Sequence, residues 1–144
     1  MSSPPFSPTV VLLIVTRAWE ARYAATLKPL GLTERKHALL AHIKAQPGIS
    51  FSELARRSRV TVQSAHTAVA GLARSGLVDD TTAHAGSAST LRVTQAGRTL
   101  LADIADAIER LDAEFSQRHP ELTDGLRAEF ERRAGNDSAN LQID

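Results

Sequence analysis

The hydrophobic positions of this chain repeat with a helical period over most of its length. A run of six aliphatic residues over 10–15 continues into apolar positions at helical spacing, which predicts a long helix over about residues 9–30. The first turns of this helix are apolar on nearly all sides, so it needs more cover than a small domain supplies, and we expect a dimer interface there. The Ser/Pro-rich residues 1–8 are expected to form a flexible arm.

A second helix is predicted after the break at residues 28–31. Thr33 is its expected cap, and Pro47-Gly48 closes it. Ile49 and Ser50 are then expected to form a short bridge strand. The inward positions of this second helix are Leu39, Leu40 and Ile43.

Residues 50–76 predict two short helices that meet at a sharp turn. Ser50 can cap the first helix, with Glu53 three residues later completing a capping box, and this helix ends near Ser58. Thr61 caps the second, which ends at Gly76 and has an apolar face at spacings of three and four. That face consists of Ala65, Ala68, Val69 and Leu72.

The opposite face of this second helix carries small polar residues and no carboxylate. It presents Gln63, Thr67, Ala70 and Arg74, with Ser64 and His66 at its edges. A helix that is merely solvated normally carries Glu and Lys, whereas a helix in the DNA major groove must fit closely and meet base edges. The pattern favours a DNA-binding helix. The alternative is a small neutral helix packed on another subunit.

Beyond Gly76 the pattern changes to two strand-like runs and then returns to helix. Residues 77–82 and 89–93 predict a β-hairpin with a loop over 83–88. Thr94 caps a long helix whose apolar residues average a spacing of 3.5, typical of helices that pack along one another. These residues are Leu101, Ile104, Ile108, Leu111 and Phe115. A last amphipathic helix follows His119-Pro120 and leads to a flexible tail over residues 135–144.

Charge is divided unevenly along the chain. Residues 1–98 hold 12 Lys and Arg against 5 Asp and Glu, and residues 99–144 hold 5 against 11, so the net charge of +1 conceals a basic and an acidic portion. The helix pair lies in the basic portion, which favours a polyanion as partner. The length predicts a single domain over residues 9–134. The absence of cysteine excludes disulfides and thiol catalysis and fits a cytoplasmic protein.

The residues predict neither an enzyme, a metal site nor a cofactor. The closest histidine pair, His37 and His42, lies about 140° apart on a helix rather than on one face. Asp79 and Asp80, near His84, would point to opposite faces of a strand. The sequence also lacks a phosphate-binding glycine loop, and its apolar run at 10–15 is too short to span a membrane.

Several short motifs occur along these elements, namely Leu32-Thr33, Ser52-Glu53-Leu54-Ala55, Val60-Thr61, Leu72 to Val78 and Val93 to Gly97. Together with the order of the elements, these motifs resemble the MarR family of winged helix-turn-helix transcriptional regulators. The resemblance implies a fold that is mainly α with a small β-hairpin wing, dimerisation helices at about 9–30 and 95–134, and a DNA-binding lobe at about 49–94. It also implies a homodimer that binds an inverted repeat in double-stranded DNA, commonly as a repressor. Binding of a small aromatic or anionic molecule would release this homodimer from the DNA.

Carried onto this chain, the resemblance implies a recognition helix over residues 61–74. Gln63 can pair with adenine and Thr67 can offer its methyl group to thymine, while the arginines are assigned to phosphates or, alternatively, to solubility. The full set of DNA-binding candidates is Ser50, Arg56, Arg57, Arg59, Thr61, Gln63, Ser64, His66, Thr67, Arg74, His84, Ser87 and Arg92.

Two positions depart from the family pattern. Arg59 stands in the turn where the family usually has glycine, so a positive φ is expected at a cost of about 1 kcal/mol. The wing tip over residues 83–89 lacks the Asp and Arg usual in the family, which weakens its attraction to the minor groove. We therefore expect weaker affinity, or a wing that is mobile without DNA.

Arg17, Trp19 and His37 are the candidates for binding a small-molecule effector. An aromatic wall with an imidazole and a guanidinium suits an anionic aromatic ligand. In the alternative interpretation, Trp19 belongs to the dimer core and His37 is a hydrogen-bonded core histidine. The alternative function is a winged-helix module that acts through protein partners, or one that binds DNA without a ligand response.

Overall fold

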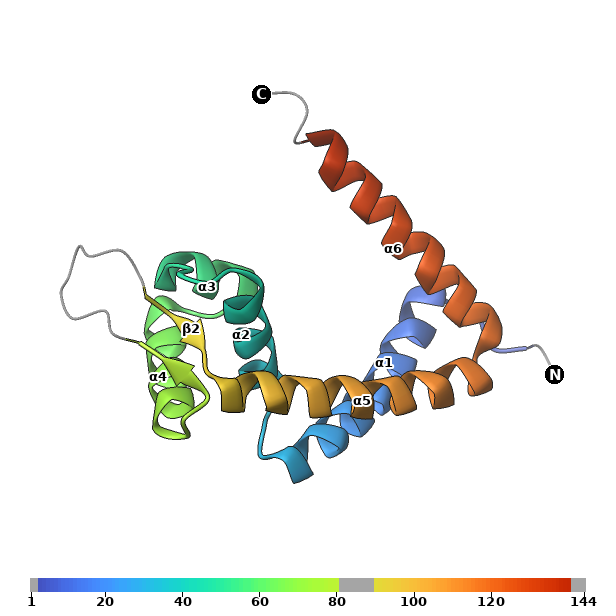
Figure 1. Cartoon of the computed structure of the whole chain (residues 1–144). Helices are drawn as coiled ribbons and strands as arrows, with labels where there is room; N and C mark the ends of the chain where they lie inside the picture. Colours follow the sequence, from blue (N-terminus) through green and yellow to red (C-terminus); the bar gives the residue numbers. More distant parts are fainter. Residues whose placement is uncertain (1–2, 81–89, 141–144) are drawn as a thin grey trace. The chain divides into compact units, whose positions relative to one another are not determined.

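The computed structural model describes residues 3–80 and 90–140 of the chain. The chain divides into two compact units, Met1–Ala107 and Ile108–Asp144. The single domain over residues 9–134 stays a prediction. The elements (Figure 1) are α1 (Pro8–Leu27), the 3₁₀ turn η1 (Lys28–Leu30), α2 (Glu34–Ala45), α3 (Phe51–Ser58), α4 (Val62–Arg74), β1 (Val78–Asp79), β2 (Arg92–Val93), α5 (Gln95–Arg118) and α6 (Pro120–Asn140).

Short polar side chains start helices α2, α3 and α4, as predicted. The side-chain oxygens of Thr33, Ser50 and Thr61 each accept a backbone N–H three residues further on, at 3.3, 3.1 and 3.0 Å. Each bond satisfies one of the first-turn N–H groups that a helix leaves unpaired. The capping box at Ser50 forms only in part, because the Glu53 carboxylate binds two arginines instead.

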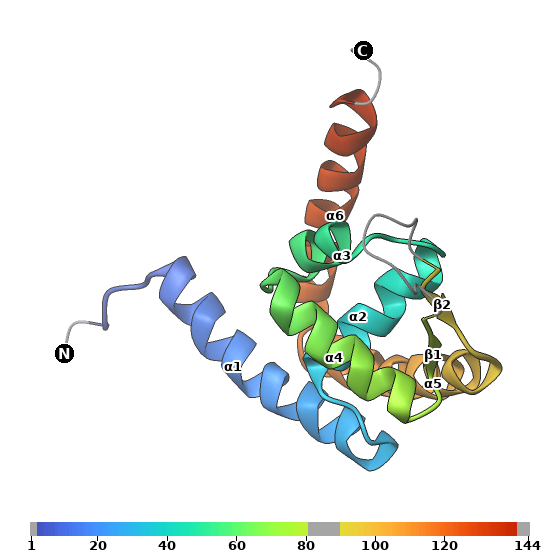
Figure 2. The same cartoon turned by 90° about the vertical axis from the view of Figure 1, so that its left-hand side faces the viewer.

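The core of the first unit lies where α2, α3, α4 and the hairpin meet. Figures 1 and 2 both place α3 beside α4, and Figure 2 shows α2 behind α4. The predicted inward faces of α2 and α4 are confirmed, since their side chains are at most 2% exposed, apart from the part-buried Ala68. Full burial of each large aliphatic side chain contributes about 1.5–3 kcal/mol, so this packing holds the angle between α3 and α4. The buried set comprises Leu39, Leu40, Ile43, Ala65, Val69 and Leu72.

The hairpin is antiparallel and its described strands are short. Val78 lies opposite Val93 and Asp79 opposite Arg92, with the valines buried and the charged residues exposed. Each strand has two residues, fewer than the predicted runs 77–82 and 89–93, of which residues 81–89 lie outside the described part. The predicted bridge strand at residues 49–50 is wrong. The Gly48 N–H donates to the Leu91 carbonyl at 2.8 Å, and a single bond makes no ladder.

The beginning of α5 packs tightly against the base of the hairpin. The Thr94 hydroxyl donates to the Gly76 carbonyl at 2.6 Å and accepts the Gly97 N–H at 3.1 Å, so the predicted cap of α5 is confirmed. A Cβ atom on Gly97 would lie 2.3 Å from the Leu77 carbonyl oxygen and 2.6 Å from Val93 Cγ1. Only glycine therefore fits at position 97, where α5 meets the base of the hairpin.

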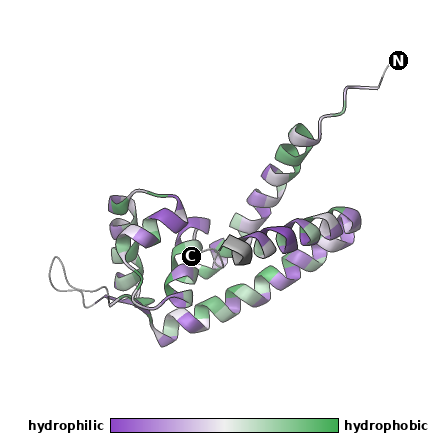
Figure 3. Ribbon diagram, turned by 90° about the horizontal axis from the view of Figure 1, so that it is seen from above, coloured by the Kyte–Doolittle hydropathy of each residue, from purple (hydrophilic) through white to green (hydrophobic). Residues whose placement is uncertain are grey.

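The first half of α1 exposes a continuous aliphatic surface. Five consecutive side chains are between 45% and 63% exposed, and Figure 3 shows this end of α1 as largely hydrophobic. The sequence predicts a dimer interface at this surface, and in the single chain the surface is exposed. No helix in the described ranges is long and apolar enough to cross a membrane. The five residues are Val10, Val11, Leu12, Leu13 and Ile14.

Helix α6 is longer than predicted and also exposes apolar side chains. It continues to Asn140, whereas the sequence predicted a flexible tail from residue 135. Polar residues cost a helix at most about 0.7 kcal/mol each and glycine about 1, so a helix already begun can continue through Gly135. Leu126 is 46% exposed and Phe130 72%.

Candidate nucleic-acid interface

The sharp turn between α3 and α4 depends on Arg59. Its φ of 54° and ψ of 43° are left-handed, and it is the single non-glycine residue of positive φ in the described ranges, as the sequence predicted. The Arg59 N–H donates to the Arg56 carbonyl at 3.3 Å, and the Val60 N–H donates to the Ala55 carbonyl at 3.0 Å. These two bonds close α3 in the way that a glycine usually does, so the turn forms despite the steric cost of an arginine there.

The outward face of α4 is exposed as predicted. Gln63, His66, Thr67 and Arg74 are exposed and Ser64 is part-buried. The face carries no carboxylate, so nothing on it repels a phosphate backbone.

Three residues on this face differ in the hydrogen bonds that they leave available. Thr67 donates its hydroxyl proton to the Gln63 carbonyl at 3.1 Å, which leaves its methyl group for apolar contact. Thr61 donates to the Ser64 hydroxyl oxygen at 2.8 Å, so Ser64 keeps its own proton to donate. Among the described residues, the Gln63 amide has no partner, and both its donor and its acceptor remain available for a base edge.

His66 has a neighbour that the sequence did not reveal. Its ring stacks on Phe51 of α3, with the ring centroids 3.7 Å apart and the planes at 15°. The stack covers one face of the imidazole and links the first turn of α3 to α4. A stacked imidazole can still meet DNA through its edge, so a role in base contact stays a prediction.

Arg56 and Arg57 are held by a carboxylate on their own helix. Arg56 donates two bonds to Glu53, at 2.9 and 2.6 Å, and Arg57 donates one at 2.8 Å. The Arg56 hydrogen bonds, and then that of Arg57, lower the pKa of Glu53 to about 2, so the carboxylate stays ionised at neutral pH. A phosphate at this point would share the guanidinium groups with Glu53.

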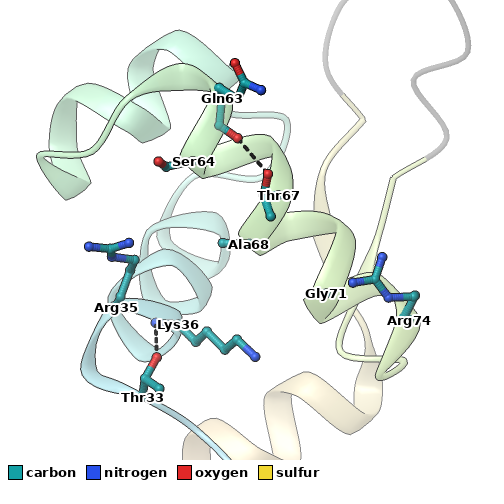
Figure 4. A pocket seen from close by; sticks show the side chains of 9 residues that line it. All are labelled: Thr33, Arg35, Lys36, Gln63, Ser64, Thr67, Ala68, Gly71 and Arg74. Carbon is teal, nitrogen blue, oxygen red and sulfur yellow. Dashed lines mark hydrogen bonds between the residues drawn. The ribbon is translucent and has the colours of Figure 1, made fainter.

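A pocket of about 480 Å³ separates the first turn of α2 from α4 (Figure 4). Four predicted DNA-binding residues line it. Ala68 and Gly71 also line the α4 side of the pocket, and their small size leaves space there. Sequence reasoning did not assign Thr33, Arg35 or Lys36 to a site, although two adjacent cations in the first turn of a capped helix are a visible signal. The predicted residues in its wall are Gln63, Ser64, Thr67 and Arg74.

The remaining DNA-binding candidates lie elsewhere. Ser50, Arg59 and Thr61 are exposed around the ends of α3 and α4, outside the pocket wall. On the hairpin, the Arg92 guanidinium donates to the Leu91 carbonyl at 2.9 Å. His84 and Ser87 fall outside the described residues, so their roles at the wing remain predictions.

The effector candidates lie on α1 and α2. Arg17 is exposed, Trp19 is part-buried with the Arg22 guanidinium carbon 5.0 Å from its ring centroid, and His37 Nδ1 is hydrogen-bonded to the Tyr23 hydroxyl. Burial lowers the pKa of His37, which favours a neutral imidazole at neutral pH.

Burial also raises the pKa of Tyr23, and the charge of Glu34 adds to this shift. His37 is hydrogen-bonded, as its alternative interpretation requires, but it is half-buried and not a core residue, and its part in ligand binding stays a prediction. Across the described ranges, no three His, Asp or Glu side chains are grouped to hold a metal ion.

Comparisons with known proteins agree with this geometry. The MarR family model matches residues 30–86. The chain is 32% identical over 110 residues to the HTH-type transcriptional repressor Rv2887 of Mycobacterium tuberculosis (strain ATCC 25618 / H37Rv), covering 76% of this chain and 77% of that protein.

Crystal structures of the Mycobacterium tuberculosis MarR family protein Rv2887 are also similar to this chain. The complex with DNA gives a TM-score of 0.70 at 27% identity, covering 92% of this chain and 98% of the other. The complex with salicylic acid gives 0.65 at 28% identity, covering 92% and 96%. The predicted fold, mainly α with a small β-hairpin wing, is confirmed. By sequence and by fold, the chain belongs to the MarR family of winged helix-turn-helix transcriptional regulators.

Proposed function

We propose that this protein is a transcriptional repressor that binds an inverted-repeat operator as a homodimer, with α4 of each subunit in a major groove. The observation that carries the proposal is the exposed, carboxylate-free face of α4, on which the Gln63 amide has no partner among the described residues. The similar protein Rv2887 is named a repressor, and one of its structures contains DNA, which supports the same role here. Two such helices on a symmetric dimer require half-sites about one helical turn, or roughly 10 bp, apart.

Replacing Gln63 with alanine is expected to weaken operator binding selectively. Loss of a bidentate contact to adenine costs about 1–3 kcal/mol, or roughly 5- to 150-fold in affinity, for each half-site, and random DNA should be bound as before. Fluorescence anisotropy with an inverted repeat from the region upstream of the gene, and with a scrambled duplex, measures both affinities. Gln46→Ala removes the same amide from an exposed site at the end of α2 and serves as the control.

The two duplexes also separate the proposed function from its alternative. Equal losses on operator and scrambled DNA would show that Gln63 does not read bases. Binding of the wild-type protein that is weak on both duplexes and insensitive to salt would favour a module that acts through protein partners, because phosphate contacts make DNA affinity fall steeply with salt.

We further propose that a small aromatic anion releases the protein from DNA by binding near the contact between α1 and α2. Rv2887 has been crystallised with salicylic acid, which supports this class of ligand. Since the lowered pKa of His37 leaves its imidazole neutral, the charge that meets a carboxylate is assigned to Arg17, with Trp19 as the aromatic wall.

Salicylate is therefore expected to bind the protein and to reduce its affinity for the operator. Calorimetric titration of salicylate should give a dissociation constant for Arg17→Gln that is weaker by roughly 10- to 150-fold, which corresponds to about 1.5–3 kcal/mol for a hydrogen bond to a charged group. Arg110→Gln, an exposed arginine on α5, is the matched control. Salicylate binding that leaves operator affinity unchanged would instead favour a regulator without ligand response.

A further inference from the structure

The pocket between α2 and α4 is basic on both sides. Arg35 and Lys36 enter it from the first turn of α2, and Arg74 enters it from the last turn of α4. Figure 4 shows the Lys36 side chain extending from α2 into the space between the two helices. The nine side chains and backbones that form its wall include no Asp or Glu, so the pocket carries three formal positive charges and no negative one.

These cations differ from the arginines of α3. Arg56 and Arg57 are bound to Glu53, whereas in the described part of the chain neither Arg35, Lys36 nor Arg74 forms an ion pair. Unpaired cations that line one concave surface create a local positive potential, which low-dielectric walls focus. The pocket is thus built to attract an oxyanion.

The pocket adjoins the residues that we propose to meet base edges. Gln63, Ser64 and Thr67 line one end of the same space, and they lie on the face of α4 assigned to the major groove. Phosphates border the groove on each side of the bases, so an anion beside these residues belongs to the backbone of the same duplex.

We propose that this pocket holds a backbone phosphate of the bound DNA, with Arg35 and Lys36 as its principal cations and Arg74 at its far end. The inference rests on the proposed function and extends the DNA-contacting surface from the helix pair onto α2. A phosphate held there sets the depth and register of α4 in the groove and carries no sequence preference of its own.

The salt dependence of DNA binding tests this proposal. Each phosphate contact contributes about −0.9 to the slope of log affinity against log salt, and a dimer has two such pockets with one phosphate in each. Arg35→Gln/Lys36→Gln should therefore lower the magnitude of the slope by roughly 2. At about 0.1 M salt this corresponds to a loss of roughly 60-fold on operator and scrambled DNA alike. Arg35→Lys keeps the charge and should retain most of the slope.

The control is Lys28→Gln/Lys44→Gln, which removes the same charge from two exposed lysines of the same unit that do not line the pocket. Thermal unfolding of both double variants checks the fold, and both are expected to match the wild type. A slope change equal to that of the control would overturn the proposal, because only net charge would then matter.

Inorganic phosphate serves as a second probe. A phosphate-induced rise in the melting temperature of the wild type that Arg35→Gln/Lys36→Gln abolishes, with an unchanged DNA slope, would assign the pocket to a free anion and also overturn the proposal. If the DNA affinity of the wild-type protein is independent of salt, the proposed function is rejected. If the wild-type affinity depends on salt and Arg35→Gln/Lys36→Gln has the same slope, only the role of the pocket is rejected.

Discussion

A chain carrying Leu13→Asp and Ile14→Asp is expected to be monomeric and to bind its operator 10²- to 10⁴-fold more weakly. These are the most exposed of the five aliphatic residues in the first half of α1, at 57% and 63%. Apolar surface contributes about 25 cal/mol per Å² when it is buried, and a carboxylate placed in such an interface must lose its hydration without a partner. The substitution therefore opposes assembly while leaving the single chain's own core intact.

The loss of operator affinity follows from the two-fold arrangement of the site. When one lobe of a dimer binds its half-site, the second lobe binds its own half-site as an intramolecular event, which raises affinity by 10²- to 10⁴-fold without any new contact. Separate monomers lose this gain, although each α4 still meets a half-site. Sedimentation velocity and anisotropy on the full operator and on a single half-site measure the two effects, and affinity for the half-site should change little.

Ala45→Asp/Gln46→Asp is the matched control, because it adds the same two negative charges at exposed positions near the end of α2. It should remain dimeric and lose only a small, salt-dependent part of its affinity. If Leu13→Asp/Ile14→Asp sediments as a dimer at the concentration where the wild type does, the interface does not include the first half of α1.

Replacing Gly97 with alanine is expected to destabilise the folded state by about 3 kcal/mol, at the upper end of the usual range for overpacking. The new Cβ would lie 2.3 Å from a backbone oxygen of Leu77, which cannot rotate away as a flexible side chain would. Relief requires α5 to move from the hairpin, and this movement strains the bonds that Thr94 makes with Gly76 and Gly97. Urea denaturation, analysed over the transition of the first unit, measures the change.

Gly125→Ala distinguishes this clash from a general effect of filling a glycine. Gly125 lies within α6 and has no atom within 4 Å of the position that a Cβ would take, so alanine there should stabilise the helix by roughly 0.5–1 kcal/mol. The two substitutions add the same methyl group and are expected to act with opposite signs. A Gly97→Ala protein as stable as the wild type would mean that α5 and the hairpin shift apart without cost.

Features that depend on residues within a turn of one another were predictable from the sequence. Thr33, Ser50 and Thr61 act as caps because the N–H groups that they satisfy lie three residues away. The left-handed Arg59 was likewise predictable, because the family that the chain resembles usually has glycine, the residue that most readily adopts a positive φ, at this point of the turn. The capture of Arg56 and Arg57 by Glu53 was visible at i, i+3 and i, i+4 spacing, but sequence reasoning assigned Glu53 to the cap.

The ends of the regular elements were predicted less well, because they depend on small energy differences. The described strands β1 and β2 end at Asp79 and begin at Arg92, short of the predicted runs, of which residues 81–89 lie outside the described part. The end of α6 at Asn140 lies beyond the predicted residue 134, since polar residues oppose a helix only weakly.

By itself the sequence determined the order of the helices, their caps and inward faces, and the family to which the chain belongs, because these follow from periodicity and from short-range spacing. Only the tertiary structure decided which distant residues share a surface. It placed Arg35, Lys36, Gln63 and Arg74 around one pocket, and it stacked Phe51 on His66. These pairs lie on different helices, and their meeting depends on how the buried core of the first unit sets the packing of α2, α3 and α4.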